Sequence, residues 1–535
     1  MPAPTSQVAL QVQRRQSLIL AGLALLLFVL GEHQQAAIGF DSRFVLFAKE
    51  MLRNGPSFFP TTYGQPYADY SATSTLFIWL LSLPFGGVSS LTAWLPTAIA
   101  SAFIVLLMYR LVAPHSTTWA LMSVALLLLS MTFITETRAV SLDQMLSAVS
   151  LSVFYLAYAH DHFAAPRRHY WLLGLLVFGF AIRGPIGLVI PTGILCSYFL
   201  LSGQWRRMIV VGVQALGLLL ACMGVLLLLA WFSGGEAFVR EVIRMQVTGR
   251  IDGTEGASGP LYYFTSSLGN YALAYPLAIV LALILLFTGR NQQGPALQLV
   301  KYCLAAGLIV MVGLSIPQAK KARYLLPMLP MAAIIAAYPF KGMSGRAFAL
   351  LRGFIQGLLL IMPGLLMLGL IVATKRVDVP VPSLPSAFIT LTILQVIALG
   401  LLFKTRWRAP GLAACAVLAL WGSYMMVFEP LERSLYNTRS FTRNAMQLID
   451  HAPAPVVLHR MGKDAKAIKF MVNLNHDLLP LFTQTEGELS ALAPPLWIVM
   501  DQKDYATLKG TPAGTTAPVL TGRFDNNDYV LLHVP

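Results

Sequence analysis

Long, uninterrupted apolar runs recur along most of this chain, and they restrict its possible folds more than any other feature. Each run has roughly 18 or more residues, which is enough to cross the hydrocarbon core of a bilayer as a helix. Of the 535 residues, 56% are hydrophobic and only 11% are charged, whereas soluble domains carry about 25% charged residues. The runs lack the alternation of strands. We therefore predict a mostly α-helical, polytopic membrane protein.

We predict about thirteen spans and a long first loop at 35–90. The apolar segment 73–88 within this loop is expected to lie in the membrane interface without crossing, because most basic loops then fall on one side of the bilayer. The N-terminus is accordingly expected in the cytoplasm of a bacterial cell, and the C-terminus outside the inner membrane. The predicted spans are 16–34, 91–112, 117–135, 143–159, 170–183, 185–202, 208–232, 269–288, 299–316, 324–340, 347–373, 386–403 and 408–427.

The chain is predicted to have two domains, a transmembrane domain at 1–430 and a periplasmic domain at 431–535. Charged and polar residues return in the second domain, where short β-like runs alternate with helix-like stretches. We expect a small α/β domain without a nucleotide-binding glycine loop. Its predicted strands are 455–458, 496–501, 519–520 and 529–534.

The formal net charge of +15 is explained by short basic loops that orient the spans, so no nucleic-acid partner is expected. The first apolar run has no clear cleavage site and is expected to be a retained helix. The chain lacks an HExxH motif, a phosphate-binding glycine loop and a Cys/His zinc pattern. A divalent metal is therefore not indicated, and no cofactor is assigned. All four cysteines lie in apolar runs, which suggests that they pack: Cys196, Cys222, Cys303 and Cys415.

Three charged segments are predicted to gather at the outer face of the membrane. Asp41 follows the first helix and is either the N-cap of the next helix or a general base at the lipid–water boundary. Glu136, Arg138 and Asp143 follow the third span, where they either form a structural ion pair or face a cavity.

The third segment holds three cations, Lys320, Lys321 and Arg323, followed by Tyr324. Cations on the outer side run against the positive-inside tendency, and a bound phosphate would explain them. Contact with anionic lipid headgroups is the alternative. Arg183 precedes Gly184 and Pro185 at a break between two spans, where it is either a snorkelling side chain or a ligand-binding one.

These segments, in this order, resemble the GT-C membrane glycosyltransferases. The closest similarity is to the branch that holds the bacterial 4-amino-4-deoxy-L-arabinose lipid A transferases and the protein O-mannosyltransferases. The matching stretches are 41–44, 49–55, 64–67, 138–143, 183–185 and 320–327. In the third stretch, Gly64 to Tyr67 is followed by Asp69 and Tyr70. Tyr70 stands where the family has a lysine that contacts donor phosphate, so it offers a hydrogen bond but no charge.

The resemblance implies an inverting hexosyl- or pentosyltransferase that works on the periplasmic face. Its donor would be a polyprenyl monophosphate sugar, and its acceptor lipid A, another glycan or a protein of the cell envelope. We expect Asp41 to be the general base and Asp143 to assist it. The expected substrate-binding residues are Arg43, Tyr67, Asp69, Tyr70, Arg138, Arg183, Lys320, Lys321, Arg323 and Tyr324.

Two other classes of protein have many spans and charges near them. A lipid or glycan transporter or flippase is the main alternative, but it would show repeat symmetry or charges near the centres of its spans. A non-catalytic assembly protein, whose tail binds a partner in the cell envelope, is the second alternative. The charges of this chain gather at one face, which favours chemistry at the membrane surface.

Overall fold

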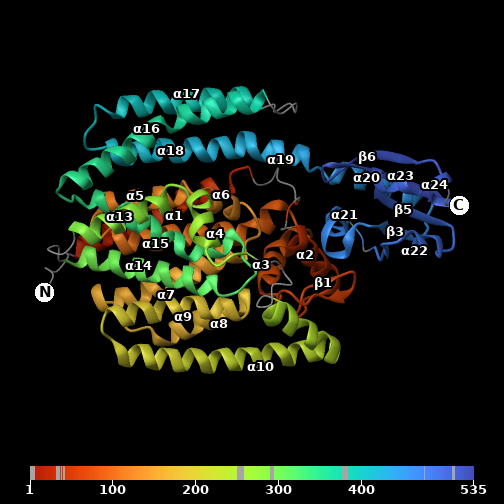
Figure 1. Ribbon diagram of the computed structural model, residues 1–535, viewed down its shortest axis with the longest axis horizontal. Helices are drawn as coiled ribbons and strands as arrows, with labels where there is room; N and C mark the ends of the chain where they lie inside the picture. The colour runs from red at the N-terminus through yellow and green to blue at the C-terminus, as the bar shows by residue number, and fades with distance from the viewer. Residues whose placement is uncertain are drawn as a thin grey trace.

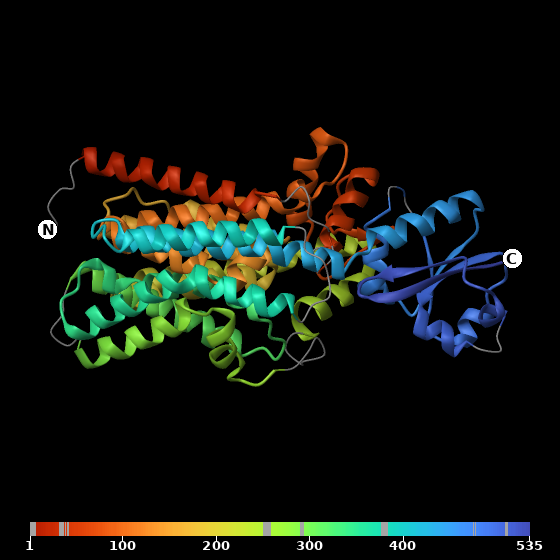
Figure 2. The same ribbon diagram turned by 90° about the horizontal axis from the view of Figure 1, so that it is seen from above.

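The computed structural model describes residues 7–31, 37, 39, 42–249, 258–288, 294–375, 383–474, 476, 478–508 and 512–535. Long helices run side by side along the long axis, and the C-terminal sheet lies at one end of the molecule (Figures 1 and 2). Eight helices of the described chain are long and apolar enough to cross a membrane. They are α1 (Gln7–Val29), α4 (Ser90–Val112), α7 (Leu142–His162), α10 (Trp205–Ile243), α14 (Pro295–Ser315), α16 (Arg346–Thr374), α17 (Leu384–Leu401) and the long helix that begins with α18 (Arg408–Ser423) and continues beyond it.

Bent pairs and shorter helices complete the bundle. α5 (Thr117–Leu128) and α6 (Met131–Thr137) meet at 72°, and α12 (Tyr262–Asn270) meets α13 (Ala274–Thr288) at 115°. Counting each pair as one span gives up to ten crossings among the described residues. The shorter helices are α8 (His169–Arg183), α9 (Pro185–Leu201) and α15 (Leu329–Ala336), the last preceded by the 3₁₀ segment η5 (Ala322–Met328). Every predicted span overlaps a helix, and the number thirteen stays a prediction.

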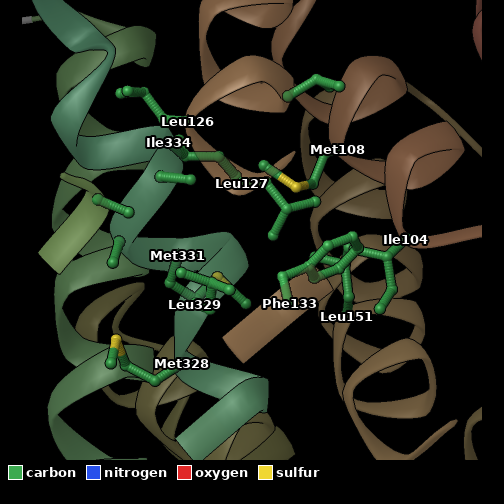
Figure 3. Close-up of a cluster of buried hydrophobic side chains, with 14 of the residues drawn as sticks. Ile104, Met108, Leu126, Leu127, Phe133, Leu151, Met328, Leu329, Met331 and Ile334 are labelled. Atoms are coloured by element: carbon green, nitrogen blue, oxygen red, sulfur yellow. The ribbon is translucent and has the colours of Figure 1, made fainter. Parts of the chain in front are cut away.

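A large apolar core joins α4, α5, α7 and α15 (Figure 3). Ile104, Leu127 and Phe133 are buried in it, together with Leu329. The Trp119 indole N–H donates to the Ile334 carbonyl at 2.9 Å, which satisfies the polar atom of a fully buried ring. Outward-facing apolar side chains remain exposed on other helices, as expected where lipid is the solvent. This rigid frame holds the loops at the end of the bundle where the charged segments lie.

The break between α8 and α9 depends on glycine. Gly184 has φ +65° and ψ −149°, a conformation that is essentially restricted to glycine. A Cβ atom at this position would lie 2.6 Å from Oε1 of Gln246. Gly179 and Gly187 allow the two helices to pack with backbone in contact, since a Cβ on Gly187 would lie 1.9 Å from the Gly179 carbonyl oxygen. Arg183 is consequently fixed at the last turn of α8.

The first loop forms a small layer at one end of the bundle (Figure 1). It contains the amphipathic helix α2 (Ser42–Asn54), a short hairpin of β1 (Thr61–Thr62) and β2 (Gln65–Pro66), and α3 (Thr73–Ser82). At ten residues, α3 is about 15 Å long. That length is half of a hydrocarbon core, so α3 alone is too short to span.

The C-terminal part is a five-stranded mixed sheet in the order β4-β3-β5-β7-β6. The strands are β3 (Val456–His459), β4 (Leu481–Thr483), β5 (Leu496–Asp501), β6 (Leu520–Phe524) and β7 (Asn527–Val534). β3 pairs parallel with β4 and β5, and β7 pairs antiparallel with β5 and β6. The connecting helices are α19 (Glu429–Leu435), α20 (Arg439–His451), α21 (Ala467–Met471), α22 (Glu486–Ser490), α23 (Gln502–Thr507) and α24 (Pro512–Thr515). Four of these strands overlap predicted ones, whereas β4 was not predicted.

Candidate active site

A buried carboxylate between two arginines forms the centre of the candidate site. Asp143 lies in the first turn of α7, whose N-cap Ser141 accepts a hydrogen bond from the Gln144 amide. Its Oδ1 is 3.0 Å from Nε of Arg183, and its Oδ2 is 3.3 Å from Nε of Arg323. These residues come from α7, the end of α8 and the 3₁₀ segment η5. A carboxylate at a helix N-terminus is favoured by the helix dipole, and here it also holds two guanidinium groups in place.

Arg183 lies between two aromatic rings. Its Cζ is 5.1 Å from the centre of the Tyr324 ring and 5.9 Å from that of Tyr70. The Tyr70 and Tyr67 rings are parallel within 11°, and Arg43 lies over Tyr67 at 5.2 Å. Only 4% of the Arg183 side chain is exposed. Cation–π contact and the Asp143 carboxylate together compensate for the burial of this charge.

Burial raises the pKa of both Tyr67 and Tyr70 well above the usual value of a phenol. Both hydroxyls therefore stay protonated near neutral pH and can donate a hydrogen bond to an anion. The neighbouring Asp69 carboxylate raises the pKa of Tyr70 further. The Tyr70 hydroxyl also forms a hydrogen bond with the Asp69 side chain, and its predicted contact with a donor phosphate stays a prediction.

A narrow pocket of about 50 Å³ opens beside this cluster. Asp69, Tyr70, Tyr263, Lys321 and Tyr324 give it polar walls, and residues such as Ile186 and Leu314 give it apolar ones. The Gln246 side chain donates to the Asp69 carbonyl at 2.7 Å and so fixes one wall. Lys321 is exposed at the pocket. The pocket can therefore receive an anionic group at its polar end.

Two larger cavities adjoin the narrow pocket. One, of about 440 Å³, shares Asp69 and Met245 with it and continues between the first loop, the end of α10 and the C-terminal part. Its polar walls include Arg244, Lys463 and Asp464. The other, of about 420 Å³, is mostly apolar and lies between α3, α8 and α10, with Gln246 at its edge. The narrow pocket thus continues into a polar cleft, and the apolar groove lies beside Gln246, whose side chain binds the Asp69 carbonyl.

The structure gathers most of the predicted site residues in one place. The residues that line or flank the pocket are Arg43, Tyr67, Asp69, Tyr70, Asp143, Arg183, Lys321, Arg323 and Tyr324. Lys320 is turned away, because its Nζ donates to the Ser258 carbonyl at 3.0 Å. Asp41, the predicted base, lies outside the described residues.

Arg138 is not part of this cluster. Its guanidinium pairs with both carboxylate oxygens of Glu429, and it also donates to the carbonyls of Phe28 at 2.7 Å and Leu30 at 2.9 Å. None of its side chain is exposed. The structure therefore corresponds to the alternative in which Arg138 forms a structural ion pair. Its partner is 291 positions away in the sequence and is not one of the neighbouring carboxylates.

Several residues of the site had no strong signal in the sequence. Gln246 and Tyr263 lie in the segment between the predicted spans 208–232 and 269–288, which carries no recognised motif. Lys463 and Asp464 belong to the C-terminal part, where no motif singled them out. Within the described residues, no three His, Cys, Asp or Glu side chains are close enough to share a metal ion. The arrangement therefore offers fixed cations and hydrogen-bond donors for an anion.

Comparison with known proteins defines the class of fold. The structure is similar to that of ArnT from Cupriavidus metallidurans bound to undecaprenyl phosphate, with a TM-score of 0.68 at 15% identity, covering 97% of this chain and 98% of that one. The apo structure of the same ArnT gives a TM-score of 0.68 at 16% identity with the same coverage. The chain has the GT-C fold of membrane glycosyltransferases.

The sequence comparison points to the same branch. Residues 73–231 match the family described as dolichyl-phosphate-mannose-protein mannosyltransferase. No curated protein sequence matches the chain significantly. The resemblance to the ArnT and protein mannosyltransferase branch, first indicated by short motifs, is confirmed by the fold.

Proposed function

We propose that this protein is a glycosyltransferase that moves a sugar from a polyprenyl monophosphate to an acceptor of the cell envelope. The observation that carries the proposal is the narrow pocket beside Asp143, Arg183 and Arg323, which is open to Lys321 and Tyr70. It lies at the end of the bundle next to the first loop, where a lipid phosphate would meet water. The similar ArnT structure with bound undecaprenyl phosphate supports this choice of donor.

The donor phosphate is the leaving group of the reaction. When the bond between the sugar C1 atom and the phosphate oxygen breaks, negative charge builds up on that oxygen. Lys321 and Arg323 would stabilise it, and the Tyr70 hydroxyl would donate a hydrogen bond. Asp143 would act by positioning Arg183 and Arg323, since its two oxygens already contact both guanidinium groups. The apolar groove between α3, α8 and α10 suits the polyprenyl chain.

The acceptor hydroxyl would attack C1 from the side opposite the leaving phosphate, which inverts the anomeric configuration. Its proton passes to a carboxylate as the new C–O bond forms. We propose Asp41 as this base, and Arg43, two positions later, lies over Tyr67 beside the site. Asp69 lines both the narrow pocket and the polar cleft, and it is the alternative base. The acceptor would be lipid A, another glycan or a protein of the cell envelope.

Donor binding tests the phosphate assignment. Undecaprenyl phosphate is titrated into detergent-solubilised protein and followed by native mass spectrometry. We expect Lys321→Gln together with Arg323→Gln to weaken binding by on the order of tenfold or more, because two charge-assisted bonds are lost. Lys341→Gln is the matched control, an exposed cation near the opposite end of the bundle. Equal affinity of the wild type and the double variant would remove these residues from the donor site.

Turnover tests the base. Polyprenyl phosphate sugars are extracted from membranes, and the release of free polyprenyl phosphate is measured in the presence of cell-envelope acceptors. We expect Asp41→Asn to slow release by about 100-fold or more while undecaprenyl phosphate still binds. Asp450→Asn, an exposed carboxylate on α20, is the control. If Asp69→Asn slows the release of polyprenyl phosphate and Asp41→Asn releases it at the wild-type rate, Asp69 is the base. If the protein is a transporter, no variant will release free polyprenyl phosphate.

A further inference from the structure

A second cationic cavity lies at the end of the bundle opposite the candidate active site. It has a volume of about 150 Å³ and lies between the end of α7, the loop that follows, the start of α8 and the start of α10. Its polar walls are His160, Arg167, Arg168, His169, Arg206 and Arg207. Leu172, Phe199 and Val210 contribute to its apolar part. The 15-residue α8 separates the two ends by about 22 Å.

The arrangement of charges leaves this cavity strongly positive. Arg207 is held by Asp161 at 2.8 Å, and the same carboxylate accepts hydrogen bonds from Tyr198 and Gln204 at 2.8 Å each. Arg167, Arg168 and Arg206 are exposed, and no carboxylate of the described chain lies within 4.0 Å of their guanidinium nitrogens. One arginine is thus fixed by the fold, whereas three more present uncompensated charge at the cavity.

The surroundings of the cavity are those of a membrane interface. Tyr170, Trp171 and Trp205 are next to its arginines in sequence and are 86%, 70% and 56% exposed. Exposed tyrosine and tryptophan rings are typical of the headgroup level of a bilayer. Below them, α10 presents the exposed apolar side chains of Ile209 and Val213 towards the lipid. A ligand here would meet cations at one end and an apolar helix surface at the other.

We propose that this cavity binds the phosphodiester headgroup of an anionic phospholipid, with its acyl chains along α10. A phosphodiester oxygen can accept bonds from several arginines, and basic pockets between transmembrane helices suit such headgroups. The His160 ring, whose Nδ1 contacts the Ala165 carbonyl at 2.9 Å, holds the loop that carries Arg167 and Arg168. The site is separate from the sugar-transfer chemistry and does not depend on it.

Lipid titration tests the proposal. Delipidated full-length protein is titrated with phosphatidylglycerol and with phosphatidylcholine, and bound lipid is counted by native mass spectrometry. We expect phosphatidylglycerol to bind in preference to phosphatidylcholine. Its affinity should fall by on the order of tenfold or more when Arg167, Arg168 and Arg206 are all replaced by Gln. The control replaces Arg346, Lys404 and Arg406 by Gln, because these exposed cations do not line the cavity. Equal binding of the two lipids, or an unchanged triple variant, would overturn the proposal.

Two competition experiments show which kind of phosphate compound binds in this cavity. Inorganic phosphate should not displace phosphatidylglycerol at millimolar concentration, since it lacks the acyl chains; full displacement would reject a lipid ligand. Undecaprenyl phosphate should compete only weakly with phosphatidylglycerol at this site. If it binds more strongly than phosphatidylglycerol and its binding also depends on the three arginines, the proposal of a phospholipid with acyl chains is rejected. If the triple variant does not fold, Arg206→Gln alone changes one exposed side chain, and we expect it to weaken phosphatidylglycerol binding about threefold.

Discussion

The contacts of Arg183 depend on the planar guanidinium group at the end of its side chain. Its charge is buried against Asp143 and covered by the rings of Tyr70 and Tyr324. We expect Arg183→Lys to destabilise the protein by about 1–3 kcal/mol, because an ammonium cannot form the fork and stacks poorly on aromatic rings. Thermal unfolding in detergent measures this as a fall in apparent Tm. Undecaprenyl phosphate binding should fall as well, because the pocket wall is disturbed.

A matched ion pair gives the control for this prediction. Arg207 pairs with Asp161 at 2.8 Å, but 38% of its side chain is exposed. Arg207→Lys should therefore cost less than about 1 kcal/mol, as is usual for exposed pairs. Equal losses of Tm in the two variants would show that burial and stacking do not set the contribution of Arg183.

Individual charges were easier to predict than their partners. Asp143, Arg183 and Arg323 were all singled out from the sequence as charges next to predicted spans, because few charges interrupt the apolar runs. Their mutual pairing depends on how α7, α8 and η5 meet, which no local pattern encodes. The same applies to Arg138, since Glu429 is 291 positions away. Periodicity identifies a helix, but it does not say which helix lies opposite.

Among the secondary-structure elements, the α8–α9 junction gives the sharpest prediction. Gly184 has a positive φ, and an added Cβ would lie 2.6 Å from Oε1 of Gln246. Gly184→Ala should destabilise the protein by about 1–3 kcal/mol and release Gln246 from the Asp69 carbonyl. Gly174→Ala on the same helix is the control, because nothing lies within 4 Å of its added Cβ. A change in Tm as large at 174 as at 184 would contradict this account of the junction.

Breaks at glycine and proline were predictable, whereas the lengths of helices outside the apolar runs were not. The Gly184–Pro185 break was expected from the residue types alone. By contrast, the predicted span 208–232 ends where hydropathy falls, but α10 continues to Ile243 across a bend at Gly235 with φ +68°. That extension carries Glu236, Arg240 and Glu241, which pair along the helix surface or with Arg244. Charged residues end a span, but they do not end a helix.

For the whole molecule, the contact between the first loop and the C-terminal part decides the shape of the polar cleft. Donors on the first loop bind backbone carbonyls of the C-terminal part: Arg43 to Asp464 at 2.9 Å, and Lys49 to Val472 at 2.6 Å. Phe44 and Phe47 belong to the same apolar cluster as Ile468 and Met471. The sequence predicted a helix after Asp41 and a small α/β domain, but the contact between them spans more than 400 positions. Carbonyl acceptors exist at every residue, so no side-chain pattern marks them.

Lys49 makes this contact sensitive to pH. Burial, together with the nearby positive charges of Arg53 and Arg439, lowers its pKa from 10.5 to about 8. Below about pH 8 the folded and unfolded chains both hold the proton, and the fold bears the full cost of a buried charge. Between pH 8 and 10.5 the folded chain has lost the proton while the unfolded chain retains it. Stability therefore rises with pH in this window, by at most about 1.4 kcal/mol per pH unit.

The comparison with Lys49→Gln isolates this effect from other titrating groups. Apparent Tm is measured from pH 7.5 to pH 9.5 in the full-length protein in detergent. As the pH rises, the Tm of the wild type should increase relative to that of Lys49→Gln. Lys503→Gln, an exposed lysine of the C-terminal part, should give no such shift. A constant difference for Lys49→Gln would mean that Lys49 remains charged, held by the Val472 and Leu474 carbonyls. In that case the hydrogen bonds from the charged Lys49 ammonium to these carbonyls would persist above pH 9. The first loop and the C-terminal part would then stay in contact in alkaline solution.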